Sequence, residues 1–177
     1  MRTLLNVNDG FLYGAGDEKV GQLINKGAKE GKAIKTKFLN SLPSLAKLVS
    51  NVKRTIEQRG FLYSVDKHRL KIREAYKGLN TLFQSAGAIA MKQALCILFD
   101  WCVERGWCTD TFYLNPNDSV YFVLNVHDEY QAEVKPEIVE EYKELAVKAI
   151  QEAGKQLNFQ CPLDGDVKEG VNWYETH

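Results

Sequence analysis

The sequence predicts an α+β fold in which long helices pack against antiparallel strands. From Tyr76 to about Glu104 the chain reads as one long helix, which ends before Gly106. Residues 119–135 are rich in β-branched and aromatic residues, a composition typical of strands. A further helix begins at Pro136, because proline is favoured in the first turn of a helix. A long helix, a strand pair and a second helix together indicate the α+β class.

The first third of the chain predicts helices followed by a hairpin. Residues 17–40 read as helical, with lysines spaced about three apart along GAKEGKAIKTKF, which suits phosphate contacts and equally a solvated surface. After Pro43 the apolar residues recur at i, i+3 and i+4, which indicates an amphipathic helix stopped by Gly60. The short β-like runs GFLYSV and HRLKIRE flank Asp66 and Lys67, and a hairpin is therefore expected there.

The last third predicts a hairpin, a helix and a tail. The polar tripeptide 127–129 separates two strand-like runs within SVYFVLNVHDEYQAEVK. The helix from Pro136 carries an apolar stripe that is expected to face the core. Its members are Ile138, Tyr142, Leu145, Ala149 and Ile150. The final segment, CPLDGDVKEGVNWYETH, is expected to be extended.

Length and composition predict an ordinary globular protein. The chain has 177 residues, long enough for one domain with a real core, and is 45% apolar and 26% charged. No window approaches 18 uncharged apolar residues and the start lacks a signal-like apolar core, so a soluble, intracellular protein is expected. The four cysteines show no metal-ligand spacing and are expected to be reduced thiols.

The net charge of zero hides a split between the two halves of the chain. Residues 1–92 carry 17 Lys and Arg against 7 Asp and Glu, whereas residues 93–177 carry 6 against 16. A basic half suggests contact with a polyanion, and an acidic half is compatible with metal. Two solvated surfaces that neutralise each other would explain the same counts.

Two carboxylates and an imidazole stand together in His127-Asp128-Glu129, at the bend between two apolar strands. Buried charge is costly unless it is paired or bound to metal. Magnesium prefers hard oxygen ligands, usually one or two carboxylates together with substrate phosphates. Asp128 at a strand end, with Glu129 pointing the opposite way, fits that demand. A solvent-exposed turn is the alternative, because a tripeptide alone is a weak signal.

One face of the long helix carries amide side chains. Asn80 and Gln84 lie at i and i+4, and the small residues Gly87 and Ala88 follow on the same side. Amides both donate and accept hydrogen bonds, so they can meet the acceptors that every base pair shows in the minor groove. Small neighbours would allow close approach. The alternative is that Gly87 and Ala88 serve helix packing while Asn80 caps a turn.

Four markers in order resemble the C-terminal third of the family A (polymerase I-like) DNA polymerases, in particular their short-tailed bacteriophage branch. GFLYGAGDEKVGQ looks like the end of the fingers motif, and DKHRLKIREAYKGLNTLFQSAGA is similar to the palm segment that tracks the primer–template minor groove. VHDEYQAEV resembles motif C, and NWYETH resembles the family's terminus. The resemblance implies an unmatched stretch at 1–9, partial helical fingers at 10–59 and the C-terminal palm portion at 60–177, with an antiparallel palm-type sheet.

The resemblance also implies a catalytic site. Asp128 would be a catalytic Mg²⁺ ligand and Glu129 its neighbouring acid. His127 would contact the primer terminus. Tyr13, with Gly14, would lie beside the nascent base pair formed by the incoming deoxynucleoside triphosphate.

Primer–template DNA is the other ligand that the resemblance implies. Asn80 and Gln84 would hydrogen-bond the terminal base pairs. Arg69 and Arg73 match basic positions near the duplex backbone. No membrane partner is expected, and a phage-encoded protein of this kind would work in the cytoplasm of the bacterial host.

Departures from the family pattern predict an incomplete site. The family's fingers helix carries Arg, Lys and an aromatic residue where this chain has Met1, Leu5 and Asp9. The family's first metal-binding aspartate lies upstream of the matched region, and two-metal transfer needs carboxylates from two strands to hold ions about 3.5–4 Å apart. We therefore expect a separately encoded N-terminal piece to supply the rest. An exposed sheet edge and apolar surface would make the isolated chain self-associate.

Two other functions are compatible with these residues. A non-catalytic DNA-binding relic or accessory module would keep the basic half and lose the chemistry, and its affinity would fall steeply with salt. A metal-dependent nuclease would use His127, Asp128 and Glu129, although nothing else in the chain supplies a second set of ligands.

Overall fold

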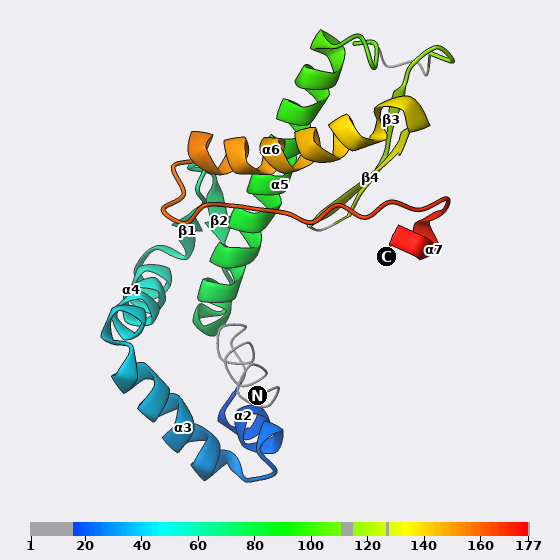
Figure 1. Ribbon diagram of the computed structural model, residues 1–177. Helices are drawn as coiled ribbons and strands as arrows, with labels where there is room; N and C mark the ends of the chain where they lie inside the picture. Colours follow the sequence, from blue (N-terminus) through cyan, green and yellow to red (C-terminus); the bar gives the residue numbers. More distant parts are fainter. Residues whose placement is uncertain (1–15, 111–114, 127, 177) are drawn as a thin grey trace. The chain divides into compact units, whose positions relative to one another are not determined.

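The computed structural model describes residues 16–110, 115–126 and 128–176. Two compact units divide the chain, an N-terminal unit that ends at Ala86 and a C-terminal unit that begins at Gly87. The helix α5 (Gly78–Glu104) contributes residues to both (Figure 1). The division falls inside this helix, and the boundary expected between residues 59 and 60 stays a prediction.

Three helices open the N-terminal unit: α2 (Asp17–Leu23), α3 (Ala28–Ser41) and α4 (Pro43–Arg59). The helix predicted over residues 17–40 is therefore two helices. The break contains Asn25, whose φ of 56° lies in the left-handed region that stops a right-handed helix. The expected start and stop of α4 are confirmed, with proline in its first turn.

Helices α2 and α3 pack through glycines. A Cβ atom on Gly31 would overlap the carbonyl oxygen of Asp17, and one on Gly21 would overlap the backbone of Gly27. An ion pair of 3.0 Å between Lys35 Nζ and Asp17 Oδ1 crosses the same contact. Only residues without a side chain let these two backbones approach so closely.

The predicted hairpin after α4 is confirmed. Gly60 adopts φ 75° as the C-cap of α4, and its N–H donates to the Ile56 carbonyl over 2.8 Å. The strands β1 (Phe61–Tyr63) and β2 (Arg69–Lys71) pair antiparallel directly after this cap. A short 3₁₀ turn, η1 (Ala75–Lys77), then leads into α5. The buried core of this unit comprises Val52, Ile56, Leu62, Ile72 and Leu79.

The C-terminal unit packs a hairpin and a helix against α5. Strands β3 (Val120–Val126) and β4 (Glu129–Val134) pair antiparallel, as predicted. A 3₁₀ turn, η2 (Pro136–Ile138), precedes α6 (Val139–Gln156). The expected extended tail ends in a short helix, α7 (Trp173–Thr176). The buried core comprises Ala94, Ile97, Leu98, Cys102, Cys108, Val120, Tyr142, Leu145, Ala146, Ala149 and Ala153.

The fold confirms the mixed α+β class and refines the expected sheet. Within the described residues the strands form two separate two-stranded hairpins, β1–β2 and β3–β4, and not one palm-type sheet. An outer strand of a single hairpin has only one partner, so each strand keeps one edge without a ladder in the described part of the chain.

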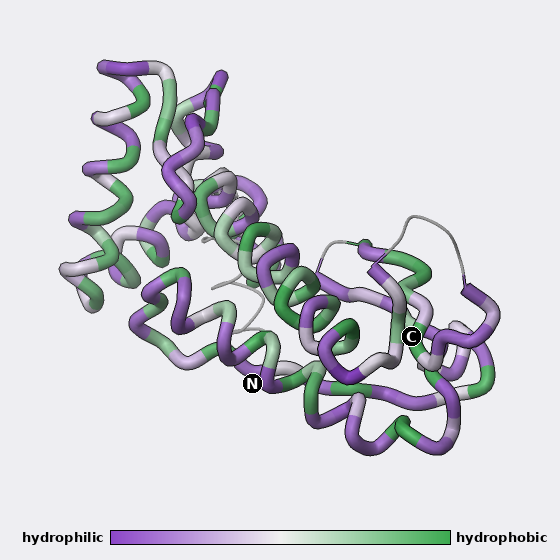
Figure 2. Tube along the Cα trace, turned by 90° about the horizontal axis from the view of Figure 1, so that it is seen from above, coloured by the Kyte–Doolittle hydropathy of each residue, from purple (hydrophilic) through white to green (hydrophobic). Residues whose placement is uncertain are grey.

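Helix α5 exposes much apolar surface. By length and composition alone it is the one described helix that could cross a membrane, a test that core helices also pass. Only 22% of its apolar window is buried, and its hydrophobic residues are visible as green turns in Figure 2. Phe83 on this helix is 44% exposed. Such a surface on a soluble protein is normally covered, so the self-association of the isolated chain stays a prediction.

Candidate metal and nucleic-acid site

Asp128 lies at the exposed tip of the β3–β4 hairpin. The tip follows from the register, in which Val126 pairs with Glu129 and the turn closes between them. Asp128 is exposed and has no ion-pair partner among the described residues. A free carboxylate at a hairpin tip is a hard oxygen donor of the kind that Mg²⁺ binds. His127, predicted to contact the primer, lies outside the described residues.

Glu129 is held differently from its neighbour. It is the first residue of β4, is half-buried, and accepts a short hydrogen bond from the Gln131 side chain at Oε1. Glu129 and Gln131 share one face because alternate residues of a strand point the same way. Thr176 reaches this face from α7, with its hydroxyl 3.4 Å from Gln131 Oε1. The two acids of the motif thus differ in exposure and in partners.

One face of the hairpin is anchored in the core. The Tyr130 hydroxyl donates to the Ala146 carbonyl over 3.3 Å, and burial raises the pKa of this phenol to about 12. The ring of Phe122 lies 5.9 Å from that of Phe99 on α5. These contacts come from the inner face of the hairpin, so the strands are held both in their middle and next to the turn, while Asp128 itself stays exposed.

The chain offers only part of a donor set for a metal. No group of three or more His, Cys, Asp and Glu within residues 16–110, 115–126 and 128–176 lies close enough to hold an ion. Asp128 fits Mg²⁺ by the chemistry of its carboxylate and would supply one ligand. A two-metal site needs carboxylates from two strands, so metal binding at Asp128 stays a prediction.

The amide face of α5 is open at its centre. Gln84 is exposed, and a Cβ atom on Gly87 would meet no described atom within 4 Å. Gly87 therefore does not serve packing against the described residues, which favours the close-approach interpretation. Asn80 is half-buried, and its Oδ1 is enclosed without a hydrogen-bond partner in the described part of the chain.

Each predicted site residue falls in one of the two units or outside the described residues. Asn80 and Gln84 belong to the N-terminal unit, whereas Asp128 and Glu129 belong to the C-terminal unit. Their meeting in one groove stays a prediction. The predicted nucleotide contacts at positions 13 and 14 lie outside the described residues.

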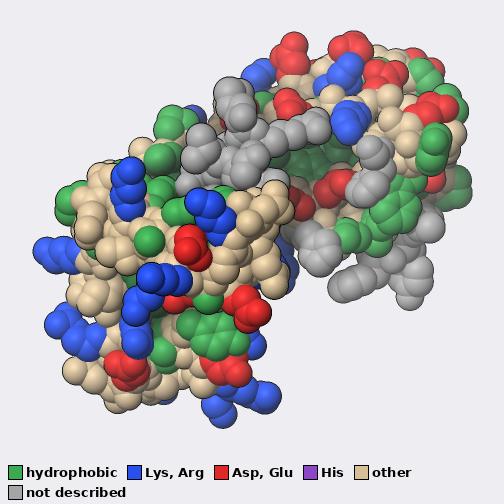
Figure 3. Space-filling model, turned by 90° about the horizontal axis from the view of Figure 1, so that it is seen from below, with side chains coloured by type: hydrophobic (Ala, Val, Ile, Leu, Met, Phe, Trp, Pro, Cys, Tyr) green, Lys and Arg blue, Asp and Glu red, His purple; other side chains and the backbone are tan. Residues whose placement is uncertain are grey.

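The N-terminal unit presents the basic residues. Its described residues, 16–86, carry 15 Lys and Arg against 6 Asp and Glu, and on its visible surface in Figure 3 Lys and Arg are scattered more widely than Asp and Glu. Arg69 and Arg73 are both exposed, one on β2 and one just after it. The guanidinium of Arg69 lies 5.0 Å from the ring centroid of Phe61.

Two aromatic residues beside these arginines were not predicted as site residues. Phe61 and Tyr63 share a strand face with Arg69, since the register pairs Tyr63 with Arg69 directly. The alternation of FLY in one strand and RLK in the other carries this signal. Because side chains alternate between the two faces of a strand, the sequence of the predicted hairpin would have placed these two aromatic residues on the same face as Arg69.

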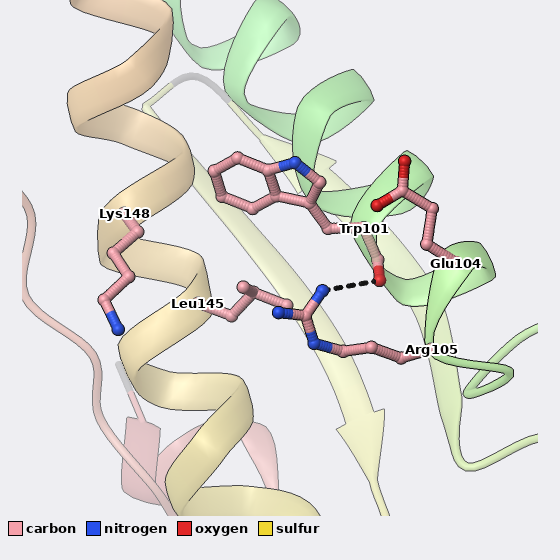
Figure 4. Close-up of a pocket in the computed structure, with 5 residues that line it drawn as sticks. All are labelled: Trp101, Glu104, Arg105, Leu145 and Lys148. Atoms are coloured by element: carbon pink, nitrogen blue, oxygen red, sulfur yellow. Dashed lines mark hydrogen bonds between the residues drawn. The ribbon is translucent and has the colours of Figure 1, made fainter.

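A shallow hollow between α5 and α6 lies apart from the predicted residues. Trp101, Glu104, Arg105, Leu145 and Lys148 line it. Arg105 bridges it by donating to the Trp101 carbonyl over 3.1 Å (Figure 4), and its Nε lies 3.4 Å from Glu141 Oε1. Both cations of the hollow are paired, Arg105 with Glu141 and Lys148 with Glu144, and none of the predicted site residues lines it.

Comparison with known proteins matches almost the whole chain. Residues 2–175 fit the sequence model of DNA polymerase family A. The DNA-directed DNA polymerases of Enterobacteria phage T3 and Escherichia phage T7 are each 34% identical over 95% of this chain and 25% of their own length. A DNA polymerase I of Streptococcus pneumoniae is 25% identical over 96% of this chain and 19% of its own. The chain thus spans about a quarter, or less, of these relatives.

A solved structure shares the fold. The POL domain of Pol1 from M. smegmatis, in complex with DNA primer-template and dNTP, superposes with a TM-score of 0.69 and 18% identity. The match covers 86% of this chain and 27% of that one. At this identity the likeness shows the arrangement of the backbone, which is that of part of a polymerase domain.

Proposed function

The chain belongs to DNA polymerase family A, and from this membership we propose that it is the C-terminal part of a DNA-directed DNA polymerase. In this proposal it supplies the end of the fingers and the C-terminal portion of the palm for template-dependent nucleotide transfer. The ligands would be primer–template DNA, deoxynucleoside triphosphates and Mg²⁺. A phage-related enzyme of this kind would act in the cytoplasm of a bacterial host.

The observation that carries the proposal is the position of Asp128. The hairpin that bears it packs on the core through Tyr130, two residues after Asp128, and through Phe122, and the Asp128 carboxylate is exposed without a paired cation among the described residues. A carboxylate that binds a metal has to be held in position and left open to the ion. A surface acid with no ligand would need neither property. Bound Mg²⁺ would supply positive charge beside the reacting phosphates.

The upstream part of a polymerase would complete the site. Val123, Leu124 and Val126 on β3 are 59%, 37% and 37% exposed, so this strand shows apolar side chains beside an edge without a ladder. Exposed apolar strands of this kind normally pack against other polypeptide. We infer that upstream palm residues, on a separately encoded chain or on the same one, cover β3 and bring the first metal-binding aspartate.

Complementation tests the proposal. The chain is mixed with the upstream three quarters of a phage family A polymerase, and primer extension with Mg²⁺ is measured. Asp128→Ala is expected to reduce extension by about 100-fold or more, the rate equivalent of several kcal/mol of lost charge stabilisation. Glu133→Ala is the matched control, because Glu133 is an exposed acid on the same hairpin. Equal effects of the two variants, or extension by the chain alone, would contradict the proposal.

The charge of the N-terminal unit favours one alternative, a non-catalytic DNA-binding module derived from a polymerase. Such a module would bind duplex DNA through its unpaired Lys and Arg, with affinity that falls steeply as salt rises. Duplex binding that is independent of Mg²⁺, together with no extension in any complemented mixture, would favour this alternative over the polymerase.

A further inference from the structure

The outer face of the β1–β2 hairpin consists of Phe61, Tyr63, Arg69 and Lys71. The register pairs Phe61 with Lys71, Leu62 with Leu70, and Tyr63 with Arg69. The middle pair packs toward the core, where Leu62 is buried. Since successive residues of a strand point to opposite faces, the two flanking pairs lie together on the face turned away from that core.

The two aromatic rings of the outer face lie against each other, and the ring of Tyr63 is exposed. The centroids of Phe61 and Tyr63 lie 5.4 Å apart, with the ring planes at 85°. The Arg69 guanidinium covers Phe61 at 5.0 Å from its centroid. Tyr63 is 51% exposed, so one of the two rings stays available to a ligand. An exposed tyrosine supported by a second ring and a cation is a preformed stacking surface.

Positive charge surrounds the outer face. Residues 59–73 carry five cations, of which none forms an ion pair with a described residue. They are Arg59, Lys67, Arg69, Lys71 and Arg73. The one acid of the segment, Asp66, lies in the turn and accepts hydrogen bonds from Ser64 and from the His68 backbone N–H, which lower its pKa. This local surface therefore complements an anion that also presents flat rings.

We propose that the outer face of the β1–β2 hairpin binds single-stranded DNA, with a base stacked on Tyr63 and phosphates beside Arg69 and Lys71. Base stacking on aromatic residues inside a basic groove is the general means by which proteins hold single strands. Duplex DNA buries its base faces and would meet only the cations. The inference rests on the proposed function in one respect: the single strand that a polymerase handles here would be the unpaired template.

Fluorescence anisotropy on the full chain tests this site without any polymerase activity. The probe is a fluorescein-labelled oligothymidine of about 12 nucleotides, within the range that single-strand binding folds cover. Tyr63→Ala is expected to weaken binding by about fivefold or more, the equivalent of losing one stacked base. Tyr63→Phe keeps the ring and is expected to bind like the unchanged chain. Tyr174→Ala removes a tyrosine that is 94% exposed in the other unit and is the matched control.

The salt dependence tests the cations separately. Lys71→Gln is expected to reduce the slope of log affinity against log salt by about 0.7, the value for one phosphate contact on a single strand. Lys47→Gln removes an exposed lysine from α4 of the same unit and is expected to leave that slope unchanged. Equal slopes for the two variants would show a diffuse field and overturn the site, as would Tyr63→Ala binding with unchanged affinity.

A last comparison separates this inference from the proposed function. In a complemented, extending mixture, Tyr63→Ala is expected to weaken binding to a primer–template with a 5′ template overhang and to leave a blunt duplex unaffected. An equal effect on both substrates would overturn the template assignment. Loss of extension in Asp128→Ala reports on the polymerase, whereas oligothymidine binding reports on the hairpin, so either can fail while the other stands.

Discussion

Replacing Tyr142 by phenylalanine is expected to stabilise the C-terminal unit. Tyr142 lies on α6 and is only 6% exposed, and its hydroxyl oxygen is buried without a hydrogen-bond partner among the described residues. Burial raises the pKa of this phenol well above its ordinary range. Both observations indicate that the hydroxyl is buried from solvent without a hydrogen-bond partner in the described core.

The magnitude follows from the cost of burying that hydroxyl. A buried polar group without a hydrogen bond costs about 1–3 kcal/mol, and phenylalanine keeps the ring and its packing. The free energy of unfolding is therefore expected to rise by about 1 kcal/mol in Tyr142→Phe. Tyr130→Phe is the matched control, because its hydroxyl donates to the Ala146 carbonyl over 3.3 Å. That variant is expected to lose about 1 kcal/mol.

Urea unfolding followed by tryptophan fluorescence measures both variants. All three tryptophans, Trp101, Trp107 and Trp173, lie in the C-terminal unit, so the signal reports on the unit that holds Tyr142. The midpoint is expected to shift upward for Tyr142→Phe and downward for Tyr130→Phe, with unchanged slopes. A downward shift of equal size in both variants would refute the reasoning.

Two other outcomes test the packing. Burial raises the pKa of Cys102 and of Tyr130 to about 12, so above about pH 9 the unfolded chain loses protons that the folded chain keeps. The free energy of unfolding is thus expected to be constant below about pH 9 and to fall as the pH rises toward 12, with a smaller fall in Cys102→Ala. A urea midpoint that does not change with pH across this range would contradict the prediction. Gly31→Ala is expected to lower the free energy of unfolding by about 1–3 kcal/mol, because the new Cβ would overlap the Asp17 carbonyl. Gly87→Ala is expected to raise it by up to about 1 kcal/mol, because alanine favours a helix and the new Cβ would meet no described atom. Thermal melting followed by circular dichroism measures both variants. Similar shifts for the two glycines would contradict the difference in their surroundings.

Much of the fold was predictable because its signals are local. Proline in the first turn and glycine after the last turn defined α4, and the alternating apolar runs around residues 127–129 defined β3 and β4. The break between α2 and α3 was missed, because lysines spaced three apart suit one helix as well as two. Asn25 in the left-handed region ends α2, and glycine packing then turns α3 back against it.

The candidate site was predictable as a set of residues and less so as an arrangement. The order of four motifs pointed to Asp128, Glu129, Asn80 and Gln84, and the family assignment is confirmed by the match over residues 2–175. The different partners of Asp128 and Glu129 could not be foreseen, since they depend on Gln131 and on the tail that returns to β4. The roles of these residues stay predictions for the complementation experiment.

The sequence by itself determined the element types, the charge division and the family, because helix and strand periods and motif order depend on neighbours along the chain. The tertiary structure decided which groups leave water and which stay exposed. It enclosed the Tyr142 hydroxyl, left Val123 and the apolar surface of α5 uncovered, and placed Tyr63 beside Arg69 on one open face. Burial depends on contacts between residues far apart in the chain, so no local pattern fixes it.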